Sequence, residues 1–354
     1  MQRFGILLDT SVLQRIIRKQ KVYERAQLYS KFGRIYNLFV VLFDLYGLDI
    51  KRNRVRGFTW SSSANRFVPI VCPLPRVIHN RVYYRSPKTS YLARRLGKRL
   101  FNPPGINRSK LWIDYLLRKN PKLRPHLPVT SRLRPNNFVL VKRYPRVFVK
   151  PIVGSLGRGV IQVQSAGRER FLFQPDWGKK RFFSTSQLKT EFNKRHLFNG
   201  RFLVQQGITL AKYYGSPFDL RVSVQKGKGG HWQVSGITAK VATKGKVLTN
   251  LSQNGRAVPV SIVLSRTFPH QDTKDILRRV KGLALEVCRT LEKTYPAFAD
   301  AGLDIGLDNK AHPWLIEVNF RDLRYSFHSA REYKIFQNTY LRPVQYAKFL
   351  LSQG

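Results

Sequence analysis

The stretch AGLDIGLDNKAHPWLIEVN, residues 301–319, decides the fold of this chain. Two runs rich in β-forming residues flank a central turn, which predicts a β-hairpin. In the expected register Asp304 faces Glu317, where like charges destabilise an antiparallel pair. Asn319 lies two residues further along and therefore points to the same face as Glu317. The opposite, apolar face is expected to hold Leu303, Ile305, Trp314, Ile316 and Val318.

A cation held by Asp304, Glu317 and Asn319 would remove the repulsion between the two acids. Oxygen ligands of this kind suit Mg²⁺ or Mn²⁺, which usually share their site with substrate phosphates. The alternative is that both acids are exposed and neutralised by surrounding lysines and arginines, and the geometry alone leaves both possibilities open. The chain is poor in acids elsewhere, since only Asp114 is acidic between residues 50 and 168.

A second motif, KPIVGSLGRGV, spans residues 150–160 and begins with Lys150 at the end of an apolar segment. Backbone N–H groups of such a loop can close around phosphate, although glycine loops also form for conformational reasons alone. The loop is neither a Walker A motif, because no GKS or GKT closes it, nor a Rossmann fingerprint, because the glycine spacing differs. Together with the hairpin, it predicts a nucleotide–Mg²⁺ site.

The charge of the chain is unusual. Its 65 Lys and Arg against 19 Asp and Glu give a net charge of +46 over 354 residues. This balance favours either a polyanionic partner or a solvated basic surface without a dedicated partner. No specific nucleic-acid motif, such as a zinc finger, RNP motif or basic zipper, accompanies the charge.

The remaining composition predicts a folded cytoplasmic protein. Cys72 and Cys288 lack CxxC spacing, which argues against a disulfide framework or structural zinc and fits a reducing compartment. We expect no signal peptide and no transmembrane segment, because the most apolar run, residues 38–43, is too short to span a bilayer.

The predicted organisation is α+β with several mixed sheets, in two or three subdomains. Short apolar runs alternate with basic loops over residues 1–100, which predicts a small α/β domain. Two helices are expected, one over 107–119 with Leu111, Trp112, Tyr115 and Leu116 as its apolar residues, and one over 273–294 with an apolar stripe of Ile276, Val280, Leu283, Ala284, Val287, Cys288 and Leu291. We expect strands over 138–142, 146–151, 160–164, 202–205, 219–225 and 232–241, a loop over 174–200, and two closing helices, one near 328–340 and one after Pro343.

The order of these motifs resembles the ATP-grasp superfamily over residues 100–330. A closer resemblance is to the YheC/YheD-type endospore coat-associated proteins, a branch of that superfamily. It is carried by HNRVYYRS (79–86), FNPPGINRSK (101–110), VQQGITLAKYYGSPFDLRVSVQK (204–226) and EVNFRDLRYSF (317–327).

The resemblance implies an ATP-grasp fold, in which two α/β subdomains clamp ATP. A pre-ATP-grasp α/β domain would occupy residues 1–100 and the ATP-grasp domain residues 101–354. Within the latter, residues 101–200 would form a first lobe with the glycine loop. Residues 201–354 would form a second lobe with the metal site and the C-terminal helices.

The resemblance also implies roles for single residues. Lys110 and Lys150 would reach the α- and β-phosphates, the glycine loop would fold over the β- and γ-phosphates, and FLVQQGI (202–208) would hold adenine. The implied cofactor-binding residues are Lys110, Lys150, Gly154, Ser155, Gly157, Gly159, Gln205, Gln206, Gly207, Ile208 and Lys240. The implied catalytic residues are Arg221, Lys150 and Asn250, and the implied metal ligands are Asp304, Glu317 and Asn319, which match a D…ExN signature.

By resemblance, the chain is an ATP- and Mg-dependent ligase that joins a carboxylate to an amine or thiol through an acyl phosphate, associated with the endospore coat. Peptide-forming relatives follow ExN with a Pro-Gly turn, whereas this chain has Phe320-Arg321-Asp322, so neither the carboxylate nor the acceptor is implied. Expected partners are ATP, this unidentified substrate pair, a polyanionic substrate and spore-coat components. Two alternatives stay open: a non-catalytic ATP-binding or structural protein of spore-coat assembly, and a nucleic-acid or polyanion binder.

Overall fold

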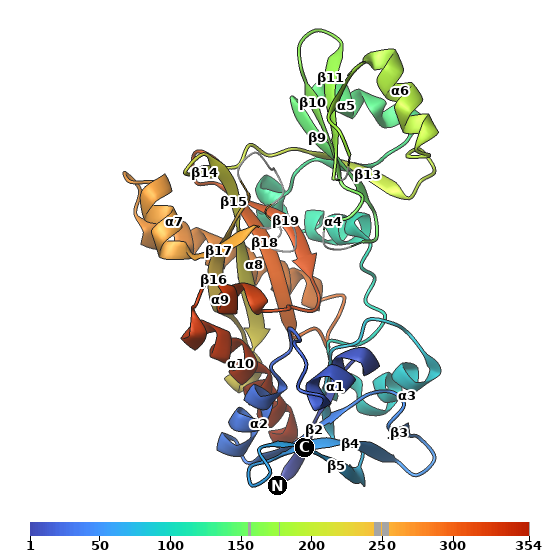
Figure 1. The fold of residues 1–354 in the computed structure, drawn as a ribbon, viewed down its shortest axis with the longest axis vertical. Coiled ribbons are helices and arrows are strands. Elements are labelled where there is room, and N and C mark those ends of the chain that lie inside the picture. The colour runs from blue at the N-terminus through green and yellow to red at the C-terminus, as the bar shows by residue number, and fades with distance from the viewer. Residues whose placement is uncertain (155–156, 177, 244–248, 250–254, 354) are drawn as a thin grey trace.

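The structure is a computed structural model that describes all residues except 155–156, 177, 244–248, 250–254 and 354. Within the described residues, three β-sheets follow one another along an elongated molecule (Figure 1). The N-terminal sheet lies at one end, the sheet that carries the glycine loop lies at the other, and the third sheet lies between them. This α+β architecture is the fold class predicted from the sequence.

The N-terminal sheet is seven-stranded, in the order β3-β4-β2-β1-β6-β7, with β5 paired to β4. Its strands are β1 (Gln2–Leu7), β2 (Leu38–Phe43), β3 (Leu48–Asp49), β4 (Arg54–Ser61), β5 (Arg66–Pro73), β6 (Val77–Asn80) and β7 (Leu100–Phe101). Its helices are α1 (Thr10–Ile17), α2 (Ala26–Ile35), α3 (Pro87–Leu96) and the 3-10 helix η1 (Gly97–Arg99). The apolar sequence of β2 follows from its central place in the sheet, where every side chain except the half-buried Phe39 is buried.

The glycine-loop sheet is antiparallel and six-stranded, in the order β12-β11-β10-β9-β13-β8. Its strands are β8 (Thr130–Arg132), β9 (Arg146–Pro151), β10 (Ile161–Ser165), β11 (Arg170–Pro175), β12 (Arg181–Ser184) and β13 (Phe202–Gln206). Its helices are α5 (Val139–Arg143), α6 (Thr185–Lys194) and the 3-10 helix η3 (Pro135–Phe138).

Two predictions for this sheet were wrong. Residues 138–142 were expected as a strand, but they form the end of η3 and most of α5, where Phe138 and Val141 reach the core of the sheet. Residues 174–200 were expected as a loop, but they contain β12 and α6. The start of α6 has a readable signal, because Ser184 and Gln187 form a reciprocal capping box.

The third sheet is antiparallel, in the order β17-β16-β15-β18-β19, with β14 paired to β15. Its strands are β14 (Lys212–Tyr213), β15 (Ser216–Lys226), β16 (Trp232–Val241), β17 (Arg256–Pro259), β18 (Asp300–Leu307) and β19 (Pro313–Asn319). The helical elements of this part are α4 (Lys110–Arg118), α7 (Val260–Thr267), α8 (Thr273–Glu292), and the 3-10 helices η2 (Pro121–His126) and η4 (Lys228–Gly230).

The two long predicted helices exist, with one correction to the buried face. In α8 the predicted apolar stripe is buried and Asp272 caps the N-terminus. In α4 the core contacts come from Ile113, Leu116 and Leu117, and the side chains of Trp112 and Tyr115 are exposed.

The C-terminus forms α9 (Tyr325–Ser329) and α10 (Tyr333–Ser352), and α10 runs on through Pro343, where two helices were expected. A proline lacks the N–H that would bond the carbonyl four residues earlier. Here the buried Gln225 side chain replaces it, since its Nε2 donates to the Thr339 carbonyl at 2.8 Å. The helix can therefore continue without an unsatisfied buried carbonyl.

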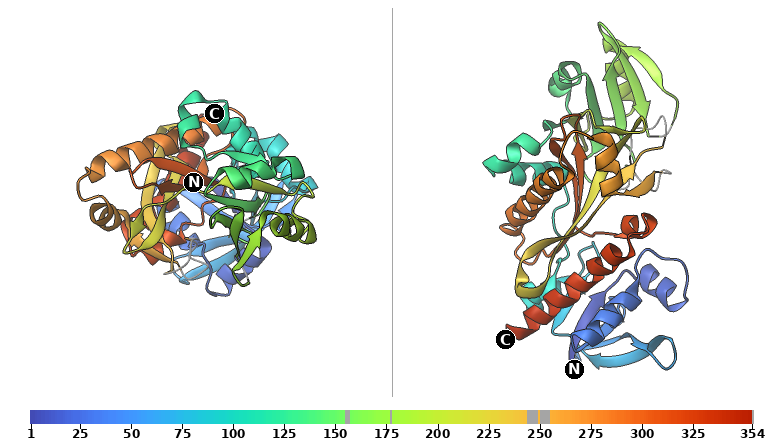
Figure 2. Two further views of the ribbon diagram at one scale, coloured as in Figure 1. Left: turned by 90° about the horizontal axis from the view of Figure 1, so that it is seen from above. Right: turned by 90° about the vertical axis from the view of Figure 1, so that its left-hand side faces the viewer.

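The hydrophobic cores cross the expected lobe boundaries. Figure 2 shows α10 lying beside the N-terminal sheet, and Phe336, Tyr340 and Val344 share a core with β1 and α2. Residues of α4 and η2 pack into the core of the third sheet. The domain boundaries at residues 100 and 200 stay a prediction.

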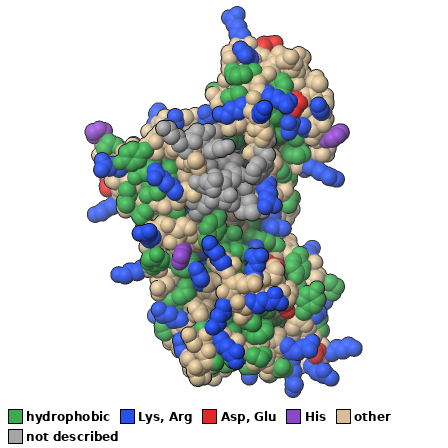
Figure 3. All heavy atoms as spheres, in the orientation of Figure 1, with side chains coloured by type: hydrophobic (Ala, Val, Ile, Leu, Met, Phe, Trp, Pro, Cys, Tyr) green, Lys and Arg blue, Asp and Glu red, His purple; other side chains and the backbone are tan. Residues whose placement is uncertain are grey.

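Basic side chains are scattered over the face shown in Figure 3 and do not gather there in a single patch. In the part of the chain that the structure describes, no helix is both long and apolar enough to cross a membrane.

Candidate functional site

Two adjoining cavities contain most of the described residues that the sequence singled out. One, which we call the hinge cavity, has a volume of about 400 Å³ and is lined by residues of the glycine loop and of the segment after β13. The other, which we call the distal cavity, has a volume of about 590 Å³ and reaches toward the N-terminal sheet. Both cavities are lined by Lys110, Lys150, Gln205, Asp304 and Glu317.

The hairpin β18–β19 has the predicted register at the predicted acids. Asp304 is directly opposite Glu317. A β-bulge follows immediately, because Ile305 pairs with Leu315 and leaves Ile316 as the extra residue. The expected place of Ile316 on the apolar face was therefore wrong, and this side chain lines both cavities while Leu315 is buried.

The three predicted metal ligands fit a hard divalent cation. Asp304, Glu317 and Asn319 all line the distal cavity, and the side chain of Glu317 is 30% exposed to solvent. Asn319 donates its Nδ2–H to Asp304 Oδ2 at 3.3 Å, which leaves its carbonyl oxygen as the possible ligand. The described ranges contain no cluster of three or more His, Cys, Asp or Glu side chains suited to a metal, and this set holds only two such groups besides its amide. The donor set is thus two carboxylates and one amide, all oxygen ligands.

Two cations hold Asp304 in place. Lys240 Nζ lies 2.8 Å from its Oδ1 and Arg221 Nε lies 3.2 Å from the same oxygen. Burial by itself would raise the pKa of Asp304, but the charges of Arg221 and Lys240 outweigh this effect and lower the pKa. Asp304 is therefore ionised, as a metal ligand must be.

Lys240 and Arg221 are both committed to neighbouring acids. Lys240 Nζ also lies 3.0 Å from Asp219 Oδ1, and Arg221 Nη1 lies 3.9 Å from Asp322 Oδ1. Asp219 and Arg221, both on β15, thus lie beside the hairpin acids. Asn250 lies outside the described residues.

Lys110 and Lys150, the two lysines predicted to bind phosphate, line both cavities. Lys150, on β9, donates its Nζ–H to Gln205 Oε1 on the adjacent strand β13 at 2.7 Å. The pKa of Lys150 is lowered to about 8. Burial is the main cause, the charge of Lys110 acts in the same direction, and Glu317 opposes the change. Lys110, at the start of α4, donates to the Gly154 carbonyl at 2.9 Å and lies 3.7 Å from Glu317 Oε1.

The glycine loop borders the hinge cavity through Gly154 and Gly157. Gly157 and Gly159 have φ angles of 70° and 71°, a left-handed region that other residues rarely adopt. The Gly159 N–H donates to Asp176 Oδ2 at 2.6 Å, so this amide is already bonded. Ser155 lies outside the described residues.

The expected adenine segment is only partly in position. Gln205, Gln206 and Ile208 line the hinge cavity. Gln206 Oε1 accepts from the Val129 N–H at 3.1 Å, so its side chain is bonded to the chain. Gly207 does not line the hinge cavity, since its N–H donates to the Arg146 carbonyl at 2.8 Å and a Cβ there would meet the Arg146 side chain.

Residues 97–350 match the sequence model of the YheC/D like ATP-grasp family. The chain belongs to this family. It is 26% identical over 326 residues to the endospore coat-associated protein YheD of Bacillus subtilis (strain 168), covering 88% of this chain and 70% of YheD. It is 22% identical over 311 residues to the endospore coat-associated protein YheC of the same organism, covering 85% of each chain.

Solved structures support the ATP-grasp fold. The ATP-grasp ligase PsnB, in complex with a phosphomimetic variant of its minimal precursor, Mg and ADP, superimposes with a TM-score of 0.51. The two chains are 14% identical, and the match covers 100% of this chain and 99% of PsnB. At this identity the likeness shows the fold alone.

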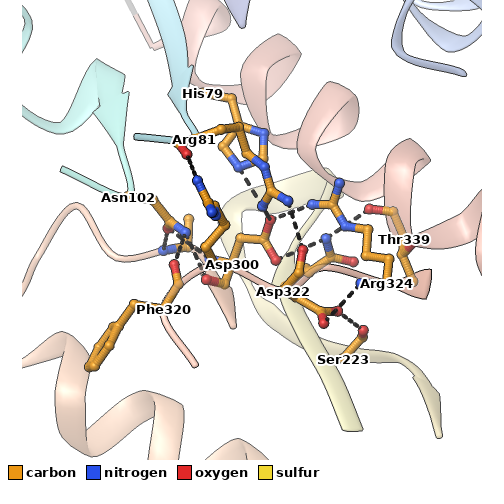
Figure 4. Close-up of polar contacts among 12 residues, drawn as sticks. His79, Arg81, Asn102, Ser223, Asp300, Phe320, Asp322, Arg324 and Thr339 are labelled. Carbon is orange, nitrogen blue, oxygen red and sulfur yellow. Dashed lines mark hydrogen bonds and ion pairs between the residues drawn. The ribbon is translucent and has the colours of Figure 1, made fainter. Parts of the chain in front are cut away.

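A buried ionic network lies beside the site of this YheC/D-like protein, and the sequence did not predict it (Figure 4). Its centre is Asp300, whose side chain is completely buried. His79 Nε2 lies 3.2 Å from Asp300 Oδ2, Arg81 Nη1 lies 3.3 Å from it, and Arg324 pairs with the same oxygen. Arg81 also pairs with Glu24 at 3.0 Å.

The network joins the segment after β19 to the site. Asp322 accepts from Ser223 through its side chain, and its backbone carbonyl accepts from Arg81 at 2.7 Å. Because Asp322 also lies near Arg221, the network extends to the hairpin acids. The signal available in the sequence was the concentration of acids after residue 272, of which Asp300 and Asp322 are buried members. His79 is completely buried, and burial lowers its pKa to about 4.

Proposed function

We propose that this chain is an ATP- and Mg²⁺-dependent ligase that activates a carboxylate as an acyl phosphate and transfers the acyl group to an amine or a thiol. One observation carries the proposal: Lys110, Lys150, Asp304 and Glu317 line both adjoining cavities. A nucleotide in the hinge cavity and a carboxylate in the distal cavity would therefore meet at these four side chains.

Catalysis of this reaction is mainly electrostatic, because the transferred phosphoryl group carries negative charge that must be balanced. Lys110 and Lys150 would bind phosphate oxygens. Arg221, which lines the distal cavity, would orient the attacking carboxylate oxygen toward the γ-phosphorus. When bound by Asp304, Glu317 and Asn319, Mg²⁺ would supply further positive charge.

The reaction balances in two displacements. The carboxylate oxygen forms a bond to the γ-phosphorus while the bond to the β-phosphate oxygen breaks, which releases ADP. The acceptor nitrogen or sulfur then bonds to the acyl carbon, phosphate leaves, and the acceptor proton passes to solvent or to the phosphate. The glycine loop borders the site where the acyl phosphate must be kept from water.

The setting we propose is the endospore coat, because YheD and YheC are named as endospore coat-associated. The second candidate function is a non-catalytic, nucleotide-binding or structural role there. It is favoured by the ion pairs of Asp304, which Lys240 and Arg221 already neutralise without a metal.

Hydroxylamine trapping tests the proposal, because hydroxylamine converts an acyl phosphate into a stable hydroxamate. With ATP, Mg²⁺ and a panel of carboxylates, we expect the wild type to form a hydroxamate with at least one acid. Arg221→Met should reduce the rate by about 10² or more, as expected for loss of a charge-stabilising donor. Arg52→Met, on the exposed Arg52, is the control and should retain the rate.

One result of this experiment would contradict the proposed ligase activity. If Mg²⁺-dependent ATP binding is present but no acid of the panel gives a hydroxamate or ADP, the non-catalytic role is favoured.

A further inference from the structure

The distal cavity extends past the hairpin acids to a cluster of aromatic and basic side chains. Tyr23, Tyr83, Arg108 and Arg321 line this end, which we call the arginine end. Two guanidinium groups lie over the ring of Tyr83, with Cζ at 4.3 Å from the centroid for Arg108 and 4.2 Å for Arg321. Stacking of this kind orients a guanidinium while leaving its N–H groups available in the plane.

Arg321 is fixed by its neighbours in sequence. Phe320 is buried in the core of the third sheet and Asp322 is buried in the ionic network. The residue between two buried side chains has little freedom, and Arg321 Nη1 is further held by Asp9 Oδ2 at 2.7 Å and by the Arg81 carbonyl at 2.6 Å.

The arginine end has an excess of positive charge. Of the three acids that line the distal cavity, Asp114 is bonded to Arg118 at 2.6 and 3.1 Å, Asp304 is bonded to Arg221 and Lys240, and Glu317 lies 3.7 Å from Lys110. Among the described residues, no acidic side chain pairs with Arg108, which is exposed and touches the ring of Tyr83. A guanidinium that is stacked on a ring and has no acidic partner is suited to bidentate binding of a carboxylate or phosphate.

We propose that Arg108 and Arg321 bind a second anionic group of the substrate, while the reacting carboxylate lies at Arg221. The substrate class is then a molecule with at least two anionic groups, such as an acidic amino acid, an acidic peptide or a phosphorylated acid. This inference rests on the proposed function, because it places the first carboxylate by the ligase reaction. Binding of the second anionic group at the arginine end would orient the substrate so that its first carboxylate lies beside the metal ligands.

Calorimetry on the full chain tests the inference, with Mg²⁺ and a non-hydrolysable ATP analogue present and at roughly 0.5 M salt. At that salt the attraction of anions to the general basic surface is largely screened. The probes are dicarboxylates of four to eight carbons, the matching phosphono-acids, L-Glu-L-Glu, and monocarboxylates of equal length. We expect at least one doubly charged probe to bind about tenfold or more tightly than its singly charged match. A larger preference for phosphono-acids would identify phosphate as the second group.

Arg108→Gln should remove this preference while the affinity for the Mg²⁺–nucleotide stays unchanged, and Arg52→Gln should keep both. Arg321→Lys should weaken the preference, and Arg108 is the primary test because its exposed side chain can be changed without disturbing the fold. The inference is overturned if no doubly charged probe is preferred, or if Arg108→Gln retains the preference. The probe titrations are repeated without nucleotide, so the preference for doubly charged probes is measured independently of nucleotide binding. A wild type that fails to bind the Mg²⁺–nucleotide but keeps this preference refutes the proposed function alone.

Discussion

Asp300→Asn should lower the free energy of unfolding by about 3–5 kcal/mol, because it removes one partner of a buried ion cluster. Asp300 balances the guanidinium groups of Arg81 and Arg324, and all three side chains are almost completely excluded from solvent. These charges hold the pKa of Asp300 below its usual range despite its burial, which by itself would raise it. Without the carboxylate, two buried guanidiniums would share the charge of Glu24.

Urea unfolding followed by circular dichroism measures this effect. The control is Asp275→Asn, because Asp275 also pairs with two arginines, Arg278 and Arg279, but does so at the surface of α8. Exposed pairs contribute little, so the control should unfold with the wild type. Equal urea midpoints for Asp300→Asn and the wild type would show that the network does not hold the N-terminal and third sheets together.

Lys150→Met should weaken Mg²⁺–ATP binding about tenfold to a hundredfold, because hydrogen bonds to charged groups contribute about 1.5–3 kcal/mol. The wild type should also lose affinity as the pH rises from 7 to 9. With a pKa of about 8, Lys150 is protonated below this pH and neutral above it, and phosphate binds the protonated form. Over this interval the loss should approach about tenfold, with uptake of a proton on binding at the higher pH.

Calorimetry at several pH values, in buffers of different ionisation enthalpy, measures both quantities. Lys142→Met is the matched control, because Lys142 lies on α5, which packs against the same sheet, and it pairs with Glu169 at the surface. If the pH dependence persists in Lys150→Met, another group titrates and Lys150 does not bind the phosphates.

The sequence predicted those parts of the fold and of the site that depend on a local sequence pattern. The central turn of residues 301–319 predicted the register that places Asp304 opposite Glu317, and the structure has that register. The apolar stripe of α8 was equally clear, because its spacing matches a helical period. These features depend on local patterns, which a single sequence displays.

The features that were missed depend on tertiary contacts. The bulge at Ile316 changes which side chains face the cavities, and nothing in the hairpin sequence requires it. The continuity of α10 through Pro343 depends on Gln225, which is more than 100 residues away and supplies the missing donor. The ionic network likewise brings together residues of the N-terminal sheet, β18 and the segment after β19.

The most direct test of the account is Mg²⁺-dependent ATP binding by wild type, Glu317→Gln and the surface control Glu169→Gln, measured by calorimetry at roughly 0.5 M salt. Glu317 lines both cavities, so its carboxylate should be needed for the metal and, through it, for the nucleotide. The account predicts that wild type and Glu169→Gln bind one ATP only when Mg²⁺ is present and that Glu317→Gln does not bind it. Binding that is absent in the wild type, or that is equal in all three proteins without Mg²⁺, would contradict it.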